Sequence, residues 1–387
     1  MNFEQIKQLE DDLQVATYSK MNLAVERGSG CWIWTSEGEK YLDLYGGHAV
    51  CATGHSHPHV VKAIQEQAEK MLFYSNLVYS QIRAKAAEKL VSVAPDSITK
   101  AFFCNSGTEA NENAMRMARM VTGREKVITF TGGFHGRTAD SISATFLGTY
   151  REIGKPNVPG HVSAEFGSIE SVRAVADVET AAIMLEPIQS MAGVREAEPA
   201  FFRELRELCD KLGIILIFDE VQTGIGRTGN WFFGSSPLAD GIEPDIITLA
   251  KSLGSGVPVG ACLVNDLVSE NIKLNNLGTT FGGGMLAMAA VVATLEAIEK
   301  NNMIANAIKV ERHLRDSLNG VSGIVAIHGK GCLLGIEFDG PCGPVHKKLL
   351  ARNIITGTSS NLNVIRLLPP MCVSVDEINM MVEVLSN

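Results

Sequence analysis

Short apolar segments that alternate with helical patterns limit the fold of this chain more than any other feature of the sequence. Apolar residues recur at helical spacing in 109–121 and 199–211. Strands that are separated by helices usually form a largely parallel sheet covered by helices. We therefore predict an α/β fold with a large, mostly parallel sheet that contains the segments 101–104, 126–130, 181–185, 213–218, 245–250 and 260–264.

The two ends of the chain are expected to form a second, smaller α+β domain. Near the C-terminus, a Gly-Lys-Gly sequence at 329–331 ends a helical stretch and precedes a new apolar strand at 332–338. A chain of 387 residues is long enough to divide into two domains. We predict a large domain at 51–300 and a small domain built from 1–50 and 301–387. The apolar helix at 285–298 fits either the core or a subunit interface.

Two polar residues directly follow buried segments of the predicted sheet. Asp219 ends one apolar segment, and Lys251 follows the next one. Taken alone, such an aspartate is more often a turn residue or a helix N-cap, and such a lysine is more often a solvated loop charge. In such sheets, however, ligands bind outside the strand ends. A carboxylate there can keep a pyridine nitrogen protonated, and a lysine can form an imine with an aldehyde. The pair predicts a site for pyridoxal phosphate (PLP), with Asp219 and Lys251 as catalytic residues.

A turn between a strand and a helix offers a site for the phosphate of such a cofactor. Ser106 and Glu109 have the spacing of a capping box at the start of the helix. The free N–H groups of a helix N-terminus attract anions, Gly107 permits close approach of the backbone, and the Thr108 hydroxyl adds a hydrogen bond. Capping alone also explains this turn. A second glycine-rich loop at 278–284 offers further donors or is simply flexible.

Taken in order, these motifs resemble the class III, ornithine-type aminotransferases of fold type I, most closely those that act on acetylornithine. The resemblance covers nearly the whole chain, from Thr17-Tyr18 to the Arg366 region. Its most specific motifs are Asn105-Ser106-Gly107-Thr108-Glu109-Ala110, Phe134-His135-Gly136-Arg137-Thr138, Glu186-Pro187-Ile188-Gln189, Asp219-Glu220-Val221-Gln222-Thr223-Gly224 and Thr279-Thr280-Phe281-Gly282-Gly283.

The resemblance implies a role for each cofactor-binding residue. Phe134 would stack on the cofactor ring, Asp219 would pair with the ring nitrogen, and Gln222 would contact the ring hydroxyl. Thr280 would reach the phosphate of the cofactor in a neighbouring subunit, which requires a homodimer with shared active sites. The implied cofactor-binding set is Ser106, Gly107, Thr108, Phe134, Asp219, Val221, Gln222, Lys251 and Thr280.

The resemblance also implies the substrates. Tyr18, Arg137, Thr279 and Arg366 match substrate-binding residues, and arginine suits this task because its fork makes two parallel bonds to a carboxylate. The implied reaction moves the δ-amine of N-acetylornithine to 2-oxoglutarate. The products would be N-acetylglutamate 5-semialdehyde and glutamate, as in arginine biosynthesis. Three alternatives stay open: N-succinylornithine as the donor, another ω-aminotransferase acting on 4-aminobutyrate or ornithine, and a PLP aminomutase of the same fold.

Three positions depart from the pattern of the family. Met191 stands where several relatives have a glutamate that masks the arginine equivalent to Arg366. Methionine cannot form an ion pair, so we expect Arg366 to stay available in both half-reactions. His48 replaces a commonly apolar residue near the substrate entrance, where it would favour an acidic acyl group or serve only the local structure. Gly284 replaces a frequent asparagine, and we have no physical account of that change.

Composition excludes several other classes of function. A formal charge of −9 argues against nucleic acid or an anionic membrane as the main partner. No apolar run reaches the roughly 18 residues of a membrane span, and we expect a cytoplasmic protein. Eight dispersed cysteines without a Cys-x-x-Cys predict reduced thiols. His55, His57 and His59 alternate beside Pro58 without further ligands, so we predict no metal site.

Overall fold

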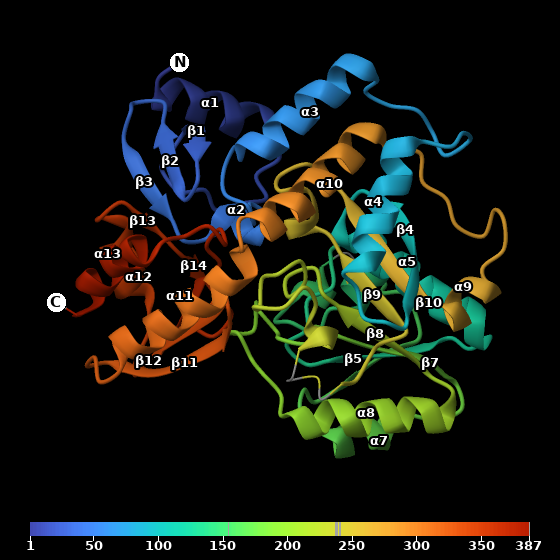
Figure 1. Ribbon diagram of the computed structural model, residues 1–387. Helices are drawn as coiled ribbons and strands as arrows, with labels where there is room; N and C mark the ends of the chain where they lie inside the picture. Colours follow the sequence, from blue (N-terminus) through green and yellow to red (C-terminus); the bar gives the residue numbers. More distant parts are fainter. Residues whose placement is uncertain (154, 237–238, 240, 387) are drawn as a thin grey trace.

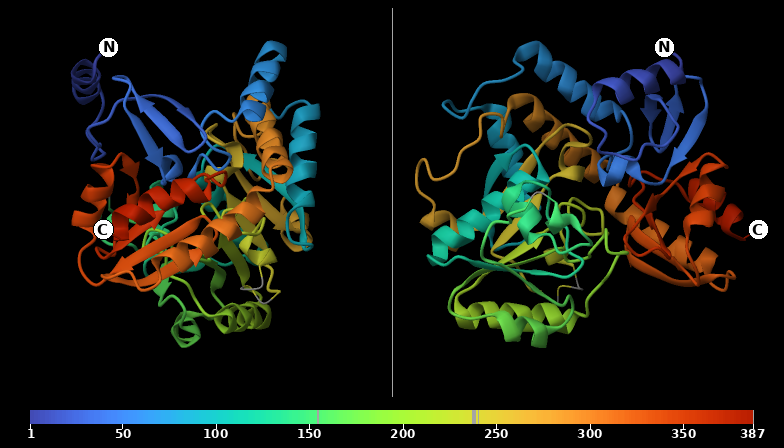
Figure 2. Two further views of the ribbon diagram at one scale, coloured as in Figure 1. Left: turned by 60° about the vertical axis from the view of Figure 1, so that its left-hand side comes forward. Right: turned by 180° about the vertical axis from the view of Figure 1, so that it is seen from behind.

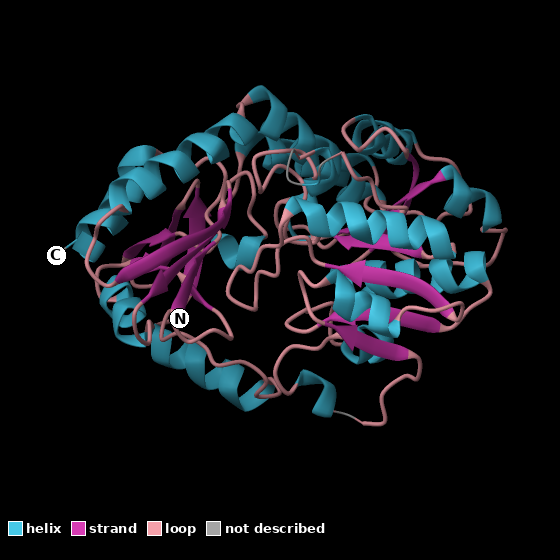
Figure 3. Cartoon of the chain, turned by 90° about the horizontal axis from the view of Figure 1, so that it is seen from below, coloured by secondary structure: helices cyan, strands magenta, loops and turns pink. Residues whose placement is uncertain are grey.

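The computed structural model describes residues 1–153, 155–236, 239 and 241–386, and three sheets organise this part of the chain. One sheet has seven strands, and two smaller sheets have four strands each. In Figure 1, segments from both chain ends lie on one side, and the seven-stranded sheet lies on the other. Figure 3 shows the strands in two separate groups with helices around them.

The seven-stranded sheet is parallel except at one strand. β10 is antiparallel to both of its neighbours, β4 and β9, while the pairs from β9 to β6 are all parallel. The order across the sheet is β4 (Ile98–Cys104), β10 (Gly260–Asn265), β9 (Ile246–Leu249), β8 (Ile215–Asp219), β7 (Thr180–Leu185), β5 (Lys126–Phe130) and β6 (His161–Ala164). All six predicted strands are present. Sequence analysis missed β6, a four-residue edge strand with two polar side chains.

Alternate residues of the central strands pack on opposite faces of this sheet. Leu216 and Phe218 of β8 join an apolar cluster with α8 (Pro199–Leu212) and α7 (Ile169–Val175). Ile215 and Ile217 join a second cluster with α5 (Gly107–Thr122). This alternation follows from the two-residue period of a strand. Both predicted helices, 109–121 and 199–211, are confirmed as α5 and α8, and Figure 2 shows α8 along one edge of the molecule.

The face of the seven-stranded sheet opposite α5 is covered by two further helices, and a third helix packs on one of them. α10 (Met285–Lys300) packs against α3 (Pro58–Lys70) and α4 (Gln81–Ser92), as Figure 1 shows. Most of its residues are buried within the chain itself, so the apolar helix predicted at 285–298 belongs to the core. The remaining short helices of this part are α6 (Ala139–Ala144) and α9 (Asp266–Asn271).

The two chain ends meet in the smaller sheets. β3 (Lys40–Asp43) pairs in parallel with β13 (Ile354–Ile355), and β1 (Val25–Ser29) and β2 (Trp32–Thr35) complete that sheet. The predicted strand at 332–338 is present as β12. The other elements are α1 (Phe3–Leu13), α2 (Gly46–Ala49), α11 (Met303–Leu318), β11 (Ile324–Lys330), β12 (Leu333–Phe338), α12 (Gly343–Leu350), β14 (Gly357–Thr358), β15 (Val364–Leu367) and α13 (Val375–Ser386).

The exact division at residues 50 and 300 stays a prediction. Among the described helices, none combines the length and the apolar character needed to cross a membrane.

Candidate active site

A cavity of about 220 Å³ opens where the seven-stranded sheet meets the start of α5. It lies at the carboxyl ends of β8 and β9, which is where open α/β sheets bind ligands. Seven predicted site residues line it together: Gly107, Thr108, Phe134, Asp219, Val221, Gln222 and Lys251.

The N-terminus of α5 presents free donors to this cavity. The Ser106 hydroxyl accepts the amide of Glu109 at 3.3 Å, which leaves the amides of Gly107 and Thr108 without partners inside the helix. The predicted capping box forms only in part, because the Glu109 carboxylate accepts the amide of Asn105 at 3.0 Å rather than that of Ser106. A Cβ atom on Gly107 would lie 3.1 Å from the Val221 side chain, so glycine keeps this approach open.

Asp219 is almost fully buried and is held by three donors. Its Oδ2 atom accepts Nδ2 of Asn111 at 2.8 Å and Nδ1 of His135 at 2.8 Å, and Oδ1 accepts the amide of Val221 at 3.1 Å. Asn111 is fixed in turn, because its Oδ1 accepts the Thr248 hydroxyl at 2.6 Å. These three bonds fix the orientation of the carboxyl group of Asp219, which can pair with the ring nitrogen of a cofactor.

Lys251 begins the short 3₁₀ helix Lys251–Gly254 after β9. Burial lowers the pKa of its amine, although Asp219 and Glu186 oppose that shift. Burial has the opposite effect on a carboxyl group and raises the pKa of Glu186. The Glu186 carboxyl group accepts the amide of Phe134 at 2.8 Å. An amine with a lowered pKa is neutral more often and is then both a nucleophile and a base.

Two further observations fit an aromatic cofactor with a hydroxyl group. Oε1 of Gln222 is buried and has no hydrogen-bond partner among the described residues. It can therefore accept a hydrogen bond from a hydroxyl group of a ligand. Phe134 lines the same cavity as a half-buried ring and meets Tyr150 edge-on at 5.6 Å between centroids. The donors, acceptors and the lysine present here therefore fit PLP.

Arg366 lies on β15 and is 2% exposed. Its guanidinium donates to the Thr358 carbonyl at 2.7 Å, the Ser190 hydroxyl at 3.1 Å and the Tyr45 hydroxyl at 2.8 Å. All three acceptors are neutral, and among the described residues no carboxylate forms an ion pair with it. Burial is the main cause that lowers its pKa, and Lys251 and Glu186 interact with its charge. Such a guanidinium is suited to bind a carboxylate.

Arg137 is exposed and contacts an aromatic side chain. It donates to the Tyr150 hydroxyl at 3.2 Å and lies over the Tyr150 ring at 4.7 Å from its centroid. Tyr150 therefore touches both Arg137 and Phe134, one residue predicted for the substrate and one for the cofactor.

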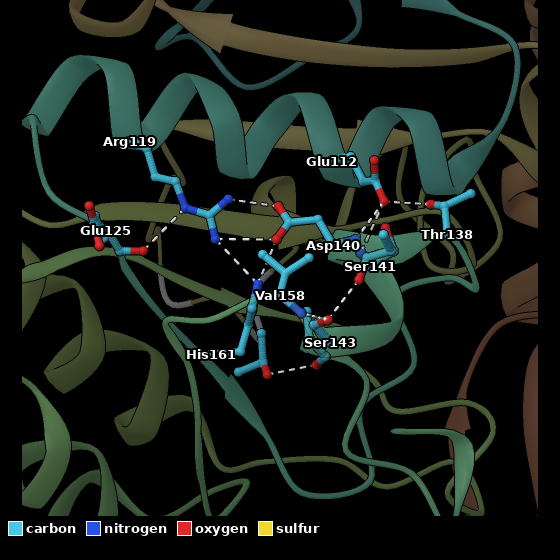
Figure 4. A network of polar contacts seen from close by, with 12 residues as sticks. Glu112, Arg119, Glu125, Thr138, Asp140, Ser141, Ser143, Val158 and His161 are labelled. Atoms are coloured by element: carbon cyan, nitrogen blue, oxygen red, sulfur yellow. Dashed lines mark hydrogen bonds and ion pairs between the residues drawn. The ribbon is translucent and has the colours of Figure 1, made fainter. Parts of the chain in front are cut away.

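The loop that carries Phe134 and Arg137 is anchored by charged residues behind it. In Figure 4, Glu112 of α5 reaches Thr138 and the start of α6, where its carboxylate accepts the amide of Asp140 at 2.9 Å. Asp140 in turn binds Arg119 at 2.7 Å and His161 at 2.7 Å. These contacts fix the loop on α5, the helix whose first turn forms one wall of the cavity.

Six predicted residues do not line this cavity: Ser106, Arg137 and Arg366, whose contacts are given above, and Tyr18, Thr279 and Thr280. Tyr18 is 77% exposed and borders a separate hollow beside α1. The Thr279 hydroxyl accepts Nδ2 of Asn105 at 3.1 Å and borders a different cavity, and Thr280 is exposed. Their predicted roles stay predictions.

The structure adds residues that sequence reasoning gave no role: Tyr45, Asn111, His135, Tyr150, Glu186 and Ser190. His135 and Glu186 stand inside family motifs and had a usable signal. Tyr45 and Tyr150 had none, because only the folded chain brings them to Arg366 and Arg137. Two of the three histidines considered for a metal have other partners: His55 binds Asp43 at 2.8 Å and His59 binds Glu296 at 2.6 Å.

The family model for class-III aminotransferases matches residues 14–387 of this chain. The chain belongs to the class-III aminotransferases. It is 40% identical to the acetylornithine aminotransferase of Archaeoglobus fulgidus over 96% of both chains. It is also 40% identical to that of Methanopyrus kandleri, over 96% of this chain and 95% of the relative.

Solved aminotransferase structures share the fold. The ornithine aminotransferase of Toxoplasma gondii ME49 matches this aminotransferase with a TM-score of 0.92 and 26% identity, covering 100% of this chain and 94% of that one. The acetylornithine aminotransferase of Elizabethkingia anophelis matches with a TM-score of 0.86 and 27% identity, covering 100% and 98%. The predicted fold class is confirmed: fold type I, with a large, mostly parallel sheet and a smaller sheet region.

Proposed function

We propose that this aminotransferase uses PLP to move the δ-amine of N-acetylornithine to 2-oxoglutarate, forming N-acetylglutamate 5-semialdehyde and glutamate. The observation that carries the proposal is one cavity in which Lys251, of lowered pKa, faces the buried carboxylate of Asp219. The acetylornithine substrate rests on the full-length likeness to relatives that bear this name.

The residues of the cavity would hold the cofactor by complementary chemistry. The amides of Gly107 and Thr108 would bind its phosphate, Phe134 would cover the ring, and Gln222 would accept the ring hydroxyl. Asp219 would pair with the ring nitrogen. PLP, when bound, supplies an electron sink for charge that develops on the substrate carbon.

Lys251 would act twice in this site. Its neutral amine would hold the cofactor and, once released by the incoming substrate amine, would carry a proton to and from the substrate δ-carbon. Burial of the site excludes water and keeps this amine neutral more often than in solution.

Arg366 and Arg137 would bind substrate carboxylates. Arg366 donates only to neutral oxygens among the described residues, so an incoming carboxylate displaces no anion. Met191, the neighbour of Ser190 in the chain, places no charge near the Arg366 guanidinium. We therefore propose that Arg366 serves both the amine donor and 2-oxoglutarate, without a masking carboxylate.

We further propose a homodimer with shared sites in the cytoplasm. Apolar side chains gather in two exposed segments, 71–79 and 274–281: Leu77 is 89% exposed, Tyr79 is fully exposed, and Leu274 is 95% exposed. The segments touch through Phe73 and Phe281, whose rings lie 5.2 Å apart. An exposed apolar patch of this kind suits a subunit contact. Thr280 lies in this exposed apolar patch and does not line the cavity of Lys251 in the same chain. This position fits a residue that contacts the cofactor of the partner subunit.

The absorbance of PLP-loaded protein tests the proposal. N-acetylornithine, added without an oxo acid, should convert the band of the lysine-bound cofactor to that of its amine form, and 2-oxoglutarate should restore the first band. Conversion by N-succinylornithine instead would name that donor. If neither converts the band, but 4-aminobutyrate or ornithine does, the enzyme is another ω-aminotransferase. Turnover of an amine without any oxo acid would identify an aminomutase.

A further inference from the structure

Two cysteine thiols from opposite ends of the chain lie side by side where the small sheets meet. The Sγ atoms of Cys31 and Cys372 are 3.9 Å apart, although 341 positions separate the two residues in the sequence. Cys31 stands in the turn between β1 and β2, and Cys372 lies in the segment that leads from β15 to α13. Among the described residues, this is the one pair of cysteine sulfur atoms within hydrogen-bond distance.

The loop between α2 and α3 holds the backbone next to both cysteines. Gly30, the residue before Cys31, exchanges two backbone hydrogen bonds with His55, at 3.1 and 2.8 Å. The residue before Cys372 donates its amide to the carbonyl of Ala52 at 2.8 Å. Because one loop tethers both backbones, the fold itself brings the two sulfur atoms together.

Glycine leaves room for the pair in the same loop. A Cβ atom on Gly54 would lie 2.8 Å from the Cys372 sulfur and 3.0 Å from the Cα atom of Gly30, and Gly54 has a φ of 94°. In a disulfide the sulfur atoms are about 2.05 Å apart, which is roughly 2 Å closer than these thiols are. A change of side-chain rotamer moves a sulfur atom far enough to close that gap.

The two thiols differ in exposure and in acidity. Cys31 is 2% exposed, whereas Cys372 is only partly buried. The hydrogen bond from Cys31, helped by the nearby charge of His55, lowers the pKa of the Cys372 thiol, although burial and Glu377 oppose the shift. The same hydrogen bond, followed by burial, raises the pKa of Cys31. The thiolate, which is the nucleophilic form, therefore develops on the more accessible sulfur.

We propose that Cys372 and Cys31 form a site of reversible oxidation, at which a small disulfide such as glutathione disulfide produces an intramolecular disulfide bond. The Cys372 sulfur attacks one sulfur of the small disulfide, so that a mixed disulfide forms and one glutathione thiolate leaves. The Cys31 sulfur then attacks the Cys372 sulfur and releases the second glutathione. The two protein thiols lose two electrons in total, and their protons pass through water to the two glutathione thiolates.

The bond would join the two chain ends without entering the active site. Neither cysteine lines the cavity of Lys251, and the closed loop spans almost the whole chain. A cross-link over such a loop limits the unfolded state and therefore stabilises the folded protein. In a reducing compartment the pair stays as two thiols, so the bond forms only when the surrounding thiol pool is oxidised.

Treatment of the purified, PLP-loaded protein with glutathione disulfide tests the inference. After the remaining thiols are blocked with iodoacetamide, mass spectrometry of a digest should show a peptide that links Cys31 to Cys372. The treated protein should unfold at a higher urea concentration than the untreated protein, and dithiothreitol should reverse both changes.

Three variants separate the two roles. Cys31→Ser should stop at the mixed disulfide on Cys372 and keep the mass of one glutathione there. Cys372→Ser should leave Cys31 unmodified, because the buried thiol reacts only through its neighbour. Cys51→Ser is the matched control, since Cys51 is also partly exposed but has no sulfur partner among the described residues, and it should form the linked peptide. Cys31→Ala replaces Cys31→Ser if that variant does not fold.

Free thiols at both positions after treatment would overturn the inference. So would a disulfide from either residue to another cysteine, or to a second chain on a non-reducing gel. The linked peptide is measured without any amine donor, so this result is independent of the proposed transamination.

Discussion

The hydroxyl oxygens of Thr108 and Thr138 lie 2.5 Å apart beside the N-terminus of α5. The Thr138 hydroxyl also donates to Oε1 of Glu112 at 2.6 Å, a contact drawn in Figure 4. An ionised carboxylate can only accept a hydrogen bond. The Thr138 proton therefore points to Glu112, and the Thr108 proton points to Thr138. In this arrangement, Thr108 is already engaged as a donor when a phosphate arrives.

Removing the Thr138 hydroxyl should strengthen cofactor binding. In Thr138→Val, the Thr108 proton loses its acceptor and is free for the phosphate, so we expect about two- to tenfold tighter PLP binding in a fluorescence titration. Ser143→Ala is the control, because the Ser143 hydroxyl bonds to Ala139 and Val158 instead. Weaker PLP binding by Thr138→Val than by the control would contradict this hydrogen-bond order.

Asn111 positions the carboxylate of Asp219, so its loss should affect both stability and rate. Asn111→Ala leaves Asp219 short of one donor and the buried Thr248 hydroxyl without its acceptor. We expect a loss of about 1–3 kcal/mol in the free energy of unfolding, and a half-reaction slowed by about tenfold. The control is Asn113→Ala, two residues further along the same helix. It removes only a hydrogen bond to a backbone carbonyl. A wild-type half-reaction rate in Asn111→Ala would refute the positioning role.

Met191→Glu should create a competitor for substrate carboxylates at Arg366. Its neighbour Ser190 contacts the guanidinium at 3.1 Å, so a carboxylate at residue 191 is expected to reach the same cation. We expect the KM for 2-oxoglutarate to rise by about tenfold, the effect of one ion pair inside a partly buried site. Met191→Gln has the same length without the charge and should change KM little. Equal KM values for the two variants would mean that residue 191 does not reach Arg366.

Folding stability should fall as the pH rises from about 6.5 to about 10. The hydrogen bond to Asp43, then one to Cys51, raises the pKa of His55 to about 10 from 6.5. Between those values, folded His55 holds a proton that the unfolded chain has lost, so stability declines by at most about 1.4 kcal/mol per pH unit. Below pH 6.5 both states are protonated, and the contribution is complete. Urea unfolding of wild type and His55→Gln at several pH values measures the difference, which should shrink toward pH 10.

A charge at residue 79 should break the proposed dimer. Tyr79 is fully exposed in the single chain and stands in the apolar segment 71–79. Tyr79→Lys would bury a cation in the contact, so we expect a monomer by light scattering and loss of bound PLP on dialysis. Leu362→Lys, which changes an exposed residue of the C-terminal part, is the control and should leave the mass unchanged. A Tyr79→Lys dimer would place the contact elsewhere.

The sequence by itself determined the large sheet, its flanking helices and the residues at its strand ends. Apolar segments such as 213–218 bury both faces whatever their neighbours are, so length and polarity were enough to locate β8 and to place Asp219 beyond it. The motif around Ser106 likewise located the start of α5, because capping is decided by a few adjacent residues.

Tertiary structure alone decided which distant side chains meet around that strand end. The direction of β10, the contact of Tyr45 with Arg366, and the donation from Asn111 and His135 to Asp219 all join residues far apart in the chain. The left-handed conformation of His48 is supported both locally, where Asp43 accepts the amides of Gly46 and Gly47, and by tertiary contacts, where Ser252 and Arg227 donate to the carbonyl of Ala49. Local patterns fix what each segment prefers, and packing between segments selects the partners of its polar groups.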